Sequence, residues 1–238
     1  MKINKSGWHM KENYLILMLS IIFLFVLGCA SVNPKVHKME KGFIDSISKH
    51  KDMKVGLIEF KTSHIGSTGR AALFGIAGMI SKTPEEIEYS HNLKMKYYKV
   101  IEEEINGNTP FQLKTEQLKD IPKLRDFAFV EEEREKWEIS EENRKLIKQF
   151  IESNGLNGAL SIHCSHGISG YIVYKVTLYT TWIIYDQDGR EAINITTYYK
   201  SKDSVPFANT LSPRYEATFL KFFKMSANDF ISVFTKNN

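Results

Sequence analysis

The run from His163 to His166, with the sequence His-Cys-Ser-His, combines residue types that could carry chemistry. Imidazole and thiolate groups bind zinc, and together they form nucleophilic pairs. On an extended strand successive side chains point to opposite faces, so Cys164 and His166 share a face while His163 points away. Zinc needs three or four convergent ligands, which His64 or His91 would have to supply from elsewhere. A metal site or a Cys/His hydrolase is one hypothesis. The other is a buried thiol at a strand end with two turn histidines.

Other signatures of catalysis are missing from the sequence. No Gly-x-Ser-x-Gly nucleophile elbow occurs, and no pair of carboxylates with distinct acid and base environments can be identified. The glycines between Gly66 and Gly78 suggest a phosphate-binding loop, but no Lys-Ser or Lys-Thr follows at the required offset. We therefore predict a protein that is not an enzyme and holds no metal or other cofactor.

The second cysteine, Cys29, lies at the end of an amino-terminal targeting segment. A lysine-rich lead is followed by an apolar run from Leu15 to Leu27 and by the small residue Gly28. This arrangement is typical of a secretory signal peptide, and the apolar run is too short to cross a bilayer comfortably as a mature helix. Residues 1–28 are therefore predicted to be a signal peptide that is removed before Cys29.

The sequence Val26-Leu27-Gly28-Cys29 resembles the lipobox of bacterial lipoproteins. The resemblance implies a diacylglyceryl group on the Cys29 thiol, cleavage between Gly28 and Cys29, and acylation, for example by palmitate, of the new amino terminus. It also implies a cell-envelope location. Ala30 stands where an aspartate would retain a lipoprotein at the inner membrane, which favours the periplasmic face of the outer membrane in a cell with two membranes. The alternatives are an ordinary signal peptide with a chance cysteine, or an uncleaved anchor.

Length and charge limit the possible functions. The chain has 238 residues and a net charge of +4, and removal of the signal leaves about 210 residues with a charge close to neutral. One large domain is expected, and no basic tract indicates nucleic-acid binding. Once Cys29 is lipidated, Cys164 is the only remaining thiol, so no intramolecular disulfide is possible.

Hydrophobic periodicity predicts the order β-α-β-α-β-β-β-α. Residues 29–53 are predicted to be the lipidated cysteine and a tether with a possible surface helix, and residues 54–238 a single globular domain. The predicted elements are strands at 54–60, 111–114 and 158–164, helices from Thr83, Ser140 and Ser212, and a hairpin of 171–185 with 191–199. Helical crossovers in the first half and a hairpin in the second predict one mixed sheet of about five strands covered by helices, an α/β (α+β) fold.

This order behind a lipobox resembles a group of envelope proteins. The group comprises the curli-secretion channel lipoproteins, the lipoprotein activators of penicillin-binding proteins, and the amino-terminal domain of the Tol-Pal system's β-propeller protein (TolB). The matching segments are Val55 to Phe60, Pro110 to Leu118, Asn157 to Cys164, and the hairpin from Tyr174 to Tyr199. The channel members insert long alternating hairpins beside the third strand. Such hairpins are missing here, so a self-made pore is not expected.

Three functional hypotheses follow. The first is a membrane-anchored, non-enzymatic scaffold that binds an envelope protein through loop tips, the segment Ala71 to Ile80 or the charged run 131–138. The second is a subunit of a secretion or assembly ring that forms a homo-oligomer through Ala71 to Ile80, a segment that could equally pack on the sheet as a small-residue helix. The third is a small metal-binding protein or hydrolase that uses His163, Cys164 and His166.

Overall fold

The structure is a computed structural model of the whole chain that describes residues 34–49, 52–65, 84–124, 139–169, 173–205 and 213–235. Several of the predicted features lie outside the described residues. These are the signal peptide with Gly28 and Cys29, the glycine-containing segment with Ala71 to Ile80, and the charged run 131–138. They remain predictions.

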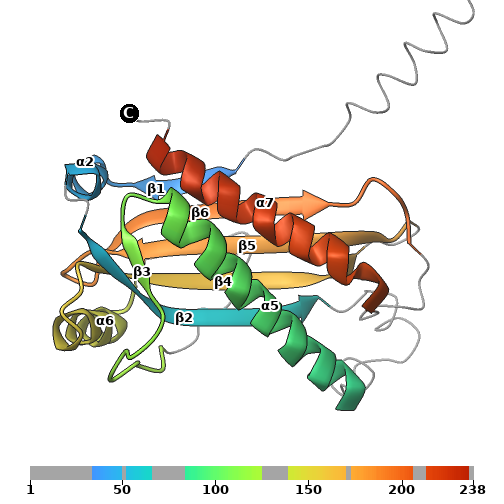
Figure 1. The fold of residues 1–238 in the computed structure, drawn as a ribbon, viewed down its shortest axis with the longest axis horizontal. Helices are drawn as coiled ribbons and strands as arrows, with labels where there is room; N and C mark the ends of the chain where they lie inside the picture. The colour runs from blue at the N-terminus through green and yellow to red at the C-terminus, as the bar shows by residue number, and fades with distance from the viewer. Residues whose placement is uncertain are drawn as a thin grey trace, which may run out of the picture. The chain divides into compact units, whose positions relative to one another are not determined.

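The described chain forms a single mixed sheet with helices on both faces, an α+β fold, as predicted (Figure 1). From the second strand onward the elements follow the predicted order. In chain order they are β1 (Lys35–Met39), α2 (Lys41–Lys49), β2 (Lys54–Ile65), α5 (Pro84–Asn108), β3 (Gln112–Lys114), α6 (Glu141–Ser153), β4 (Gly158–Ser169), β5 (Lys175–Tyr185), β6 (Glu191–Lys200), a 3-10 turn (Pro213–Tyr215) and α7 (Glu216–Thr235).

The sheet has six strands in the order β1-β6-β5-β4-β2-β3. β2 runs parallel to β3 and to β4, because a helical crossover precedes each of those two strands. β4, β5, β6 and β1 pair antiparallel. β4 is central: it pairs with β2 from Gly158 to Gly167 and with β5 from Ala159 to Ser169.

The predicted tether is wrong for residues 35–49, which belong to the domain. β1 adds a sixth strand beside β6, with Lys35 opposite Thr196 and Met39 opposite Ile193. α2 is the expected helix: Lys41, Asp45 and Lys49 are exposed, while Ile44 and Ile47 are buried in the main core. The polar composition of this segment hid β1, whose stability comes from pairing with β6.

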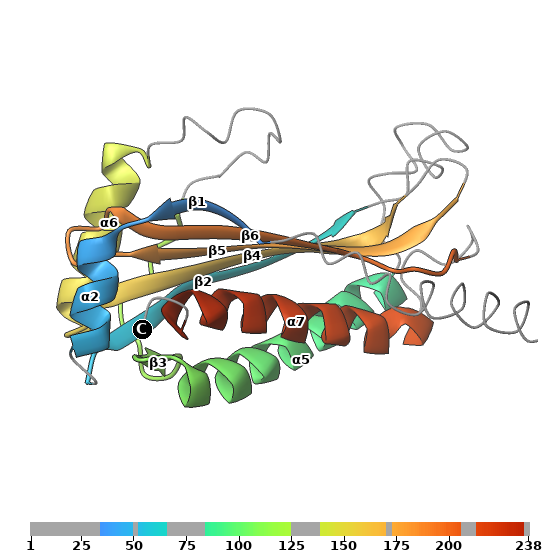
Figure 2. The ribbon, with the colours of Figure 1, turned by 90° about the horizontal axis from the view of Figure 1, so that it is seen from above.

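α5 and α7 cover one face of the sheet with a largely aromatic core (Figure 2). Trp182 of β5 stacks on Phe230 of α7 with ring centroids 4.9 Å apart, and its indole nitrogen donates a 2.8 Å hydrogen bond to Ser226. The apolar positions of both helices point into this core. They are Leu93, Tyr97, Ile101 and Ile105 in α5, and Phe219, Phe222, Phe223, Phe230 and Phe234 in α7.

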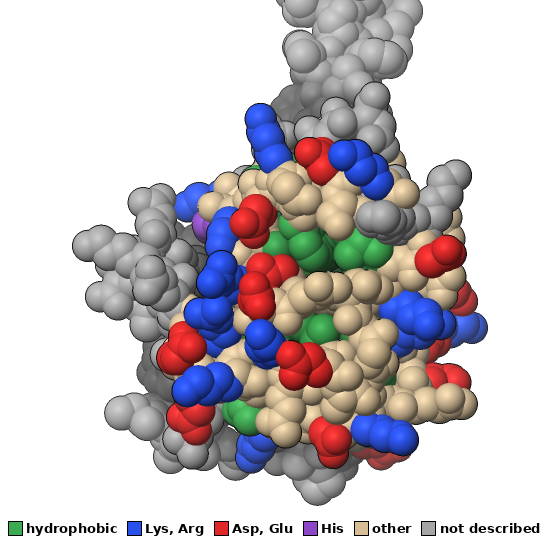
Figure 3. Space-filling model, turned by 90° about the vertical axis from the view of Figure 1, so that its left-hand side faces the viewer, with side chains coloured by type: hydrophobic (Ala, Val, Ile, Leu, Met, Phe, Trp, Pro, Cys, Tyr) green, Lys and Arg blue, Asp and Glu red, His purple; other side chains and the backbone are tan. Residues whose placement is uncertain are grey.

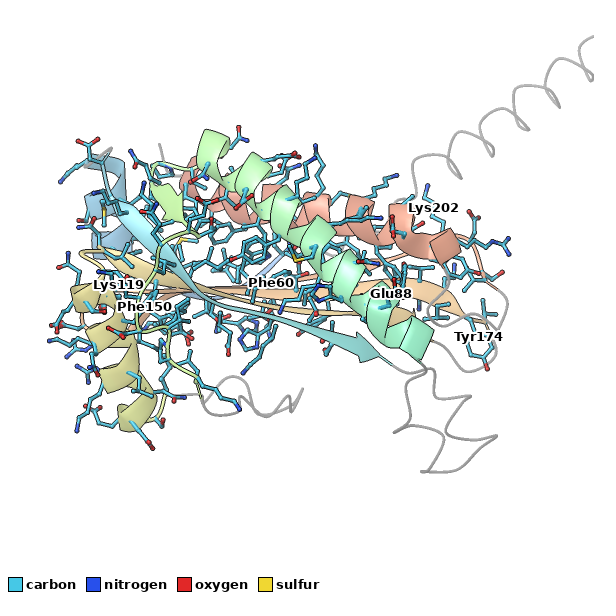
Figure 4. All side chains as sticks on the ribbon, turned by 60° about the horizontal axis from the view of Figure 1, so that its bottom comes forward. Phe60, Glu88, Lys119, Phe150, Tyr174 and Lys202 are labelled. Carbon is cyan, nitrogen blue, oxygen red and sulfur yellow. The ribbon has the colours of Figure 1, made fainter. Side chains whose placement is uncertain are left out.

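α6 covers one end of the opposite face (Figure 2). Its buried side chains Ile147, Phe150 and Ile151 pack against a second cluster that includes Ile58 and Ile183. Figure 4 shows Phe150 at α6 and Phe60 beside α5, one in each core. The Ser140 hydroxyl accepts a hydrogen bond from the Asn143 backbone nitrogen and so caps the helix that was predicted to begin at Ser140.

The turn between β5 and β6 is anchored to α6. Gly189 adopts a φ of 72°, and an added Cβ would lie 2.4 Å from the carbonyl oxygen of Arg144. The Arg144 side chain donates to the carbonyl of Asp188, and Lys148 forms an ion pair with the Asp188 carboxylate at 3.3 Å. This contact holds the α6 end of the hairpin in place.

No helix in the part of the chain that the structure describes has both the length and the apolar character needed to cross a membrane.

We predict that Gly189→Ala destabilises the domain by about 2 kcal/mol or more, because alanine disfavours a positive φ and its methyl group would collide with α6. Urea unfolding of the purified protein measures this loss. Gly107→Ala is the control, since a Cβ at Gly107 of α5 meets nothing within 4 Å. Equal stability of the two variants would show that the turn does not rest on α6.

Candidate functional site

The structure divides the residues of the predicted cluster between the two faces of β4. Cys164 and His166 point toward α5 and α7, as expected, and both are buried in or beside the aromatic core. His163 points to the opposite face, with Ser161. β4 continues to Ser169, so both histidines lie within the strand, and their placement in a turn is corrected. β4 extends beyond its predicted end at residue 164 because β2 pairs with it on one side and β5 on the other.

Cys164 is poorly suited to act as a nucleophile. Its side chain is 1% exposed, and burial raises the pKa of the thiol to about 12. The thiolate is the reactive form of cysteine, so the thiol is in its inert form near neutral pH. Cys164 therefore behaves as a small core residue.

His166 is a packing residue on the same face. Its ring lies 5.7 Å from Tyr97 of α5 and 5.1 Å from Phe219 of α7, both in edge-on geometry. These contacts fix the ring between the two helices and the sheet. His166 and Cys164 thus lie together, but in an aromatic environment rather than a polar pocket.

His163 belongs to a polar cluster that the sequence did not reveal, formed with Glu59, Lys61 and Ser161. Nε2 of His163 lies 2.8 Å from Oε2 of Glu59, and the Lys61 ammonium lies 2.8 Å from Oε1 of Glu59. The Ser161 hydroxyl lies 3.0 Å from the same His163 nitrogen and donates to Glu59 Oε2 at 3.3 Å. We call these four residues the Glu59 cluster.

The residues of the Glu59 cluster come from neighbouring positions on two adjacent strands. Ser161 pairs with Glu59 and His163 pairs with Lys61 in the parallel ladder between β4 and β2. The available sequence signal was Glu59 itself, the one acidic residue inside the otherwise apolar run from Val55 to Phe60. A buried carboxylate requires hydrogen-bond or charge partners. The position of Glu59 in the sequence therefore predicts a polar contact but does not identify the partner residue.

The Glu59 cluster resembles a Ser-His-acid triad in composition but not in geometry. A carboxylate can only accept hydrogen bonds, so His163 carries its proton on Nε2, the nitrogen that faces Glu59. Ser161 approaches this same nitrogen. A triad needs the serine and the acid on opposite ring nitrogens, so that the histidine can take the hydroxyl proton. Ser161 is moreover fully buried.

The electrostatics of Glu59 are those of a satisfied structural charge. Burial raises its pKa, but hydrogen bonds and charge attraction from His163 and Lys61 outweigh burial and hold the pKa below its ordinary value. The side chain of Glu59 is 12% exposed and that of His163 17%. Glu59 is therefore a carboxylate at neutral pH, held by Lys61 of its own strand and by His163, which joins β2 to β4.

Hydroxyl and aromatic side chains continue this polar surface across the sheet. Thr181 and Thr196 lie 3.3 Å apart, His37 Nε2 lies 3.2 Å from the Thr196 hydroxyl, and the hydroxyls of Ser63 and Ser165 are 2.5 Å apart. The rings of Tyr179 and Tyr198 are neighbours at 6.3 Å. We call this surface the polar face. It consists of the Glu59 cluster with His37, Ser63, Ser165, Tyr179, Thr181, Thr196 and Tyr198.

Two hollows of about 320 Å³ flank the turn between β5 and β6. One has acidic walls with Glu40 and Asp188 and an apolar floor with Phe43 and Met53. The other includes Arg144 and other charged side chains of both signs. Figure 3 shows this end of the molecule, where acidic and basic side chains intermingle around small hydrophobic areas. Neither hollow contains a residue of the predicted cluster.

Metal-binding geometry is likewise not found within the described ranges, where no group of three or more His, Cys, Asp or Glu side chains could hold an ion. His91 is exposed on α5, distant in the fold from the face that carries His163. The three residues of the hydrolase hypothesis are thus not brought together into one site.

The sequence matches no protein-family model and no curated protein. Among solved structures, the chain is similar to the dodecamer of a single-residue variant of PelC from Paraburkholderia phytofirmans, at 9% sequence identity and a TM-score of 0.30. The match covers 74% of this chain and 88% of that one. At this level of similarity it carries no argument about function.

We predict that Glu59→Gln lowers the free energy of unfolding by about 1 to 3 kcal/mol at neutral pH, the usual worth of hydrogen bonds to a charged group. Because the folded-state pKa of Glu59 lies below its ordinary value of 4.5, this stabilisation is complete above about pH 4.5. It is lost as the pH falls through the folded-state pKa. The difference between wild type and variant should therefore shrink in acid, as measured by urea unfolding from about pH 7 to about pH 3.

Glu141→Gln is the control for this experiment, because Glu141 forms an ion pair with Arg144 while 66% exposed. It should change stability little at any pH. A Glu59→Gln protein as stable as wild type at neutral pH would contradict the structural role of the Glu59 cluster.

Proposed function

We propose that this chain is a membrane-anchored envelope lipoprotein whose domain binds another envelope protein without catalysing a reaction. In this proposal Cys29 carries the lipid, and the sheet presents a binding surface. The sequence Val26-Leu27-Gly28-Cys29 supports the anchor. The binding role is supported by the way in which the described helices cover one face of the sheet more fully than the other (Figure 2).

That uneven covering is the observation on which the binding role rests. α5 and α7 lie along the whole of one face, whereas on the other face α6, among the described helices, covers only one end (Figure 2). The remainder of that face is the polar face, where Tyr179 and Tyr198 are partly exposed and Ser63 is exposed. Tyrosine is enriched in protein interfaces because its ring supplies area and its hydroxyl supplies a hydrogen bond.

The arrangement of the reactive side chains supports a non-enzymatic role. Cys164 is buried as a neutral thiol, and His163 presents its Nε2 proton to Glu59 rather than accepting one from Ser161. The polar face nevertheless offers the partly exposed Tyr179 and Tyr198 and the exposed Ser63 on a rigid sheet. Such a surface is suited to recognition of a protein partner through hydrogen bonds and aromatic contacts.

We predict that the double variant Tyr179→Ala, Tyr198→Ala captures at least about tenfold less partner than wild type. Interfacial tyrosines each contribute about 1 to 2 kcal/mol to the binding free energy. The measurement is quantitative mass spectrometry of proteins chemically cross-linked to the tagged chain in intact cells. Met95→Ala is the matched control, because Met95 is 56% exposed on α5, away from the polar face.

The Cys29→Ala variant separates anchoring from binding in the same experiment. It should move to the soluble fraction and, in extracts, still capture the same partner. Membrane association that persists without Cys29 would contradict the lipid anchor. Equal capture by the tyrosine variant and the Met95 variant would contradict the role of the polar face.

A further inference from the structure

In the described part of the chain, the distal half of β2 forms an open edge of the sheet. β3 pairs with β2 only at Lys54, Val55 and Gly56, whereas β4 pairs with β2 as far as Ile65. Within the described residues, no strand lies on the outer side of β2 after Gly56. Figure 4 shows β2 continuing along the margin of the sheet past Phe60.

Side-chain exposure rises along the distal half of β2. Phe60 is buried in the core, but Lys61 and Thr62 are partly exposed and Ser63 is exposed. On the central strand β4, by contrast, Ser165 and His166, which pair with Ser63 and His64, are buried.

The other described edges of the sheet carry several features that discourage pairing, and the distal half of β2 carries fewer of them. β1 has a register irregularity between Val36 and Lys38 and exposed lysines, and β3 is only three residues long. Lysines, bulges and short edge strands are the usual protections against added strands. β2 has its irregularity before Glu59, and from Phe60 to Ile65 it contains no proline and one lysine.

The charges beside this edge indicate the kind of segment it would accept. Lys61 extends from the strand on the polar face with its side chain 43% exposed. On the other face Lys94 of α5 lies 5.7 Å from the centre of the Phe60 ring, and no described carboxylate pairs with it. Glu59, the one acidic residue of this stretch, is paired with His163 and Lys61, so among the described residues Lys94 supplies the positive charge that remains beside this edge.

We propose that the edge of β2 from Phe60 to Ile65 accepts an extended, acidic segment of the partner protein as an additional strand. Main-chain hydrogen bonds would supply the affinity, as in other cases of strand addition. Two adjacent carboxylates would point to opposite faces, so one of them would meet Lys94. A second copy of this chain would instead bring the same cations to both sides of the edge. The inference deepens the proposed function and depends on it.

The test uses the full-length protein in detergent and a fluorescent peptide of about eight residues of threonine and valine, with two adjacent central glutamates. Fluorescence anisotropy should show binding, and a twin peptide with two central lysines should bind at least about tenfold more weakly. Amide hydrogen exchange should slow in β2 between Phe60 and Ile65. Absence of binding at millimolar peptide concentration, or equal binding of the glutamate and lysine peptides, would overturn the proposal.

Strand pairing is distinguished from simple charge attraction by N-methylation of the peptide. Every second amide of an added strand faces the sheet, so methylating one alternate set should abolish binding and methylating the other set should not. If both methylated peptides bind alike, strand addition is wrong.

Lys94→Glu should weaken the binding of the acidic peptide by at least about fivefold. Lys99→Glu is the control with the same change of net charge, since Lys99 is 77% exposed on α5 and pairs with Glu103. Equal effects of the two variants would overturn the placement at this edge. These outcomes do not affect the experiment with the Tyr179 and Tyr198 variant. A negative result for strand addition at β2 can therefore be distinguished from a negative result for partner binding by the polar face.

Discussion

The pairing of β4 with β2 on one side and β5 on the other is the constraint on which the rest of the structure depends. It holds twelve residues, Gly158–Ser169, in one extended register. Because side chains alternate along a strand, this register decides which residues enter the aromatic core and which form the polar face. A shift by one residue would place His163 among the rings of α7 and Cys164 beside Glu59.

The same alternation explains how one run of sequence yields two different environments. On the α5 and α7 side, the aromatic core leaves Cys164 and His166 as packing residues. On the other side, His163 completes a set of donors around a charge that would be costly to bury alone. The run from His163 to His166 resembles a catalytic motif only in the sequence. In the fold its alternate side chains lie on opposite faces of the sheet.

The sequence predicted much of the fold because its helices and hairpin have strong local signals. The helices predicted from Ser140 and Ser212 and the predicted hairpin each depend on residues within one element, namely the Ser140 cap, the phenylalanines of α7 and the Asp-Gly turn. β1 escaped prediction because its stability comes from pairing with β6, which is distant in the sequence. The end of β4 was placed too early for the same reason, since its continuation depends on β2 and β5. The polar face could be predicted only in part. Glu59 stands out as a charge in an apolar strand, but its partner His163 is 104 positions away, and only the parallel register brings them together.

The central claim is that the polar face and its β2 edge meet another protein. Photo-cross-linking in the cells that make the protein tests it most directly, with a photoreactive amino acid in place of Tyr179, Ser63 or Met95 in turn. We expect one shared adduct from positions 179 and 63, heavier than the protein itself, and none from position 95. Adducts that form equally from position 95, or no adduct from the polar face, would contradict it.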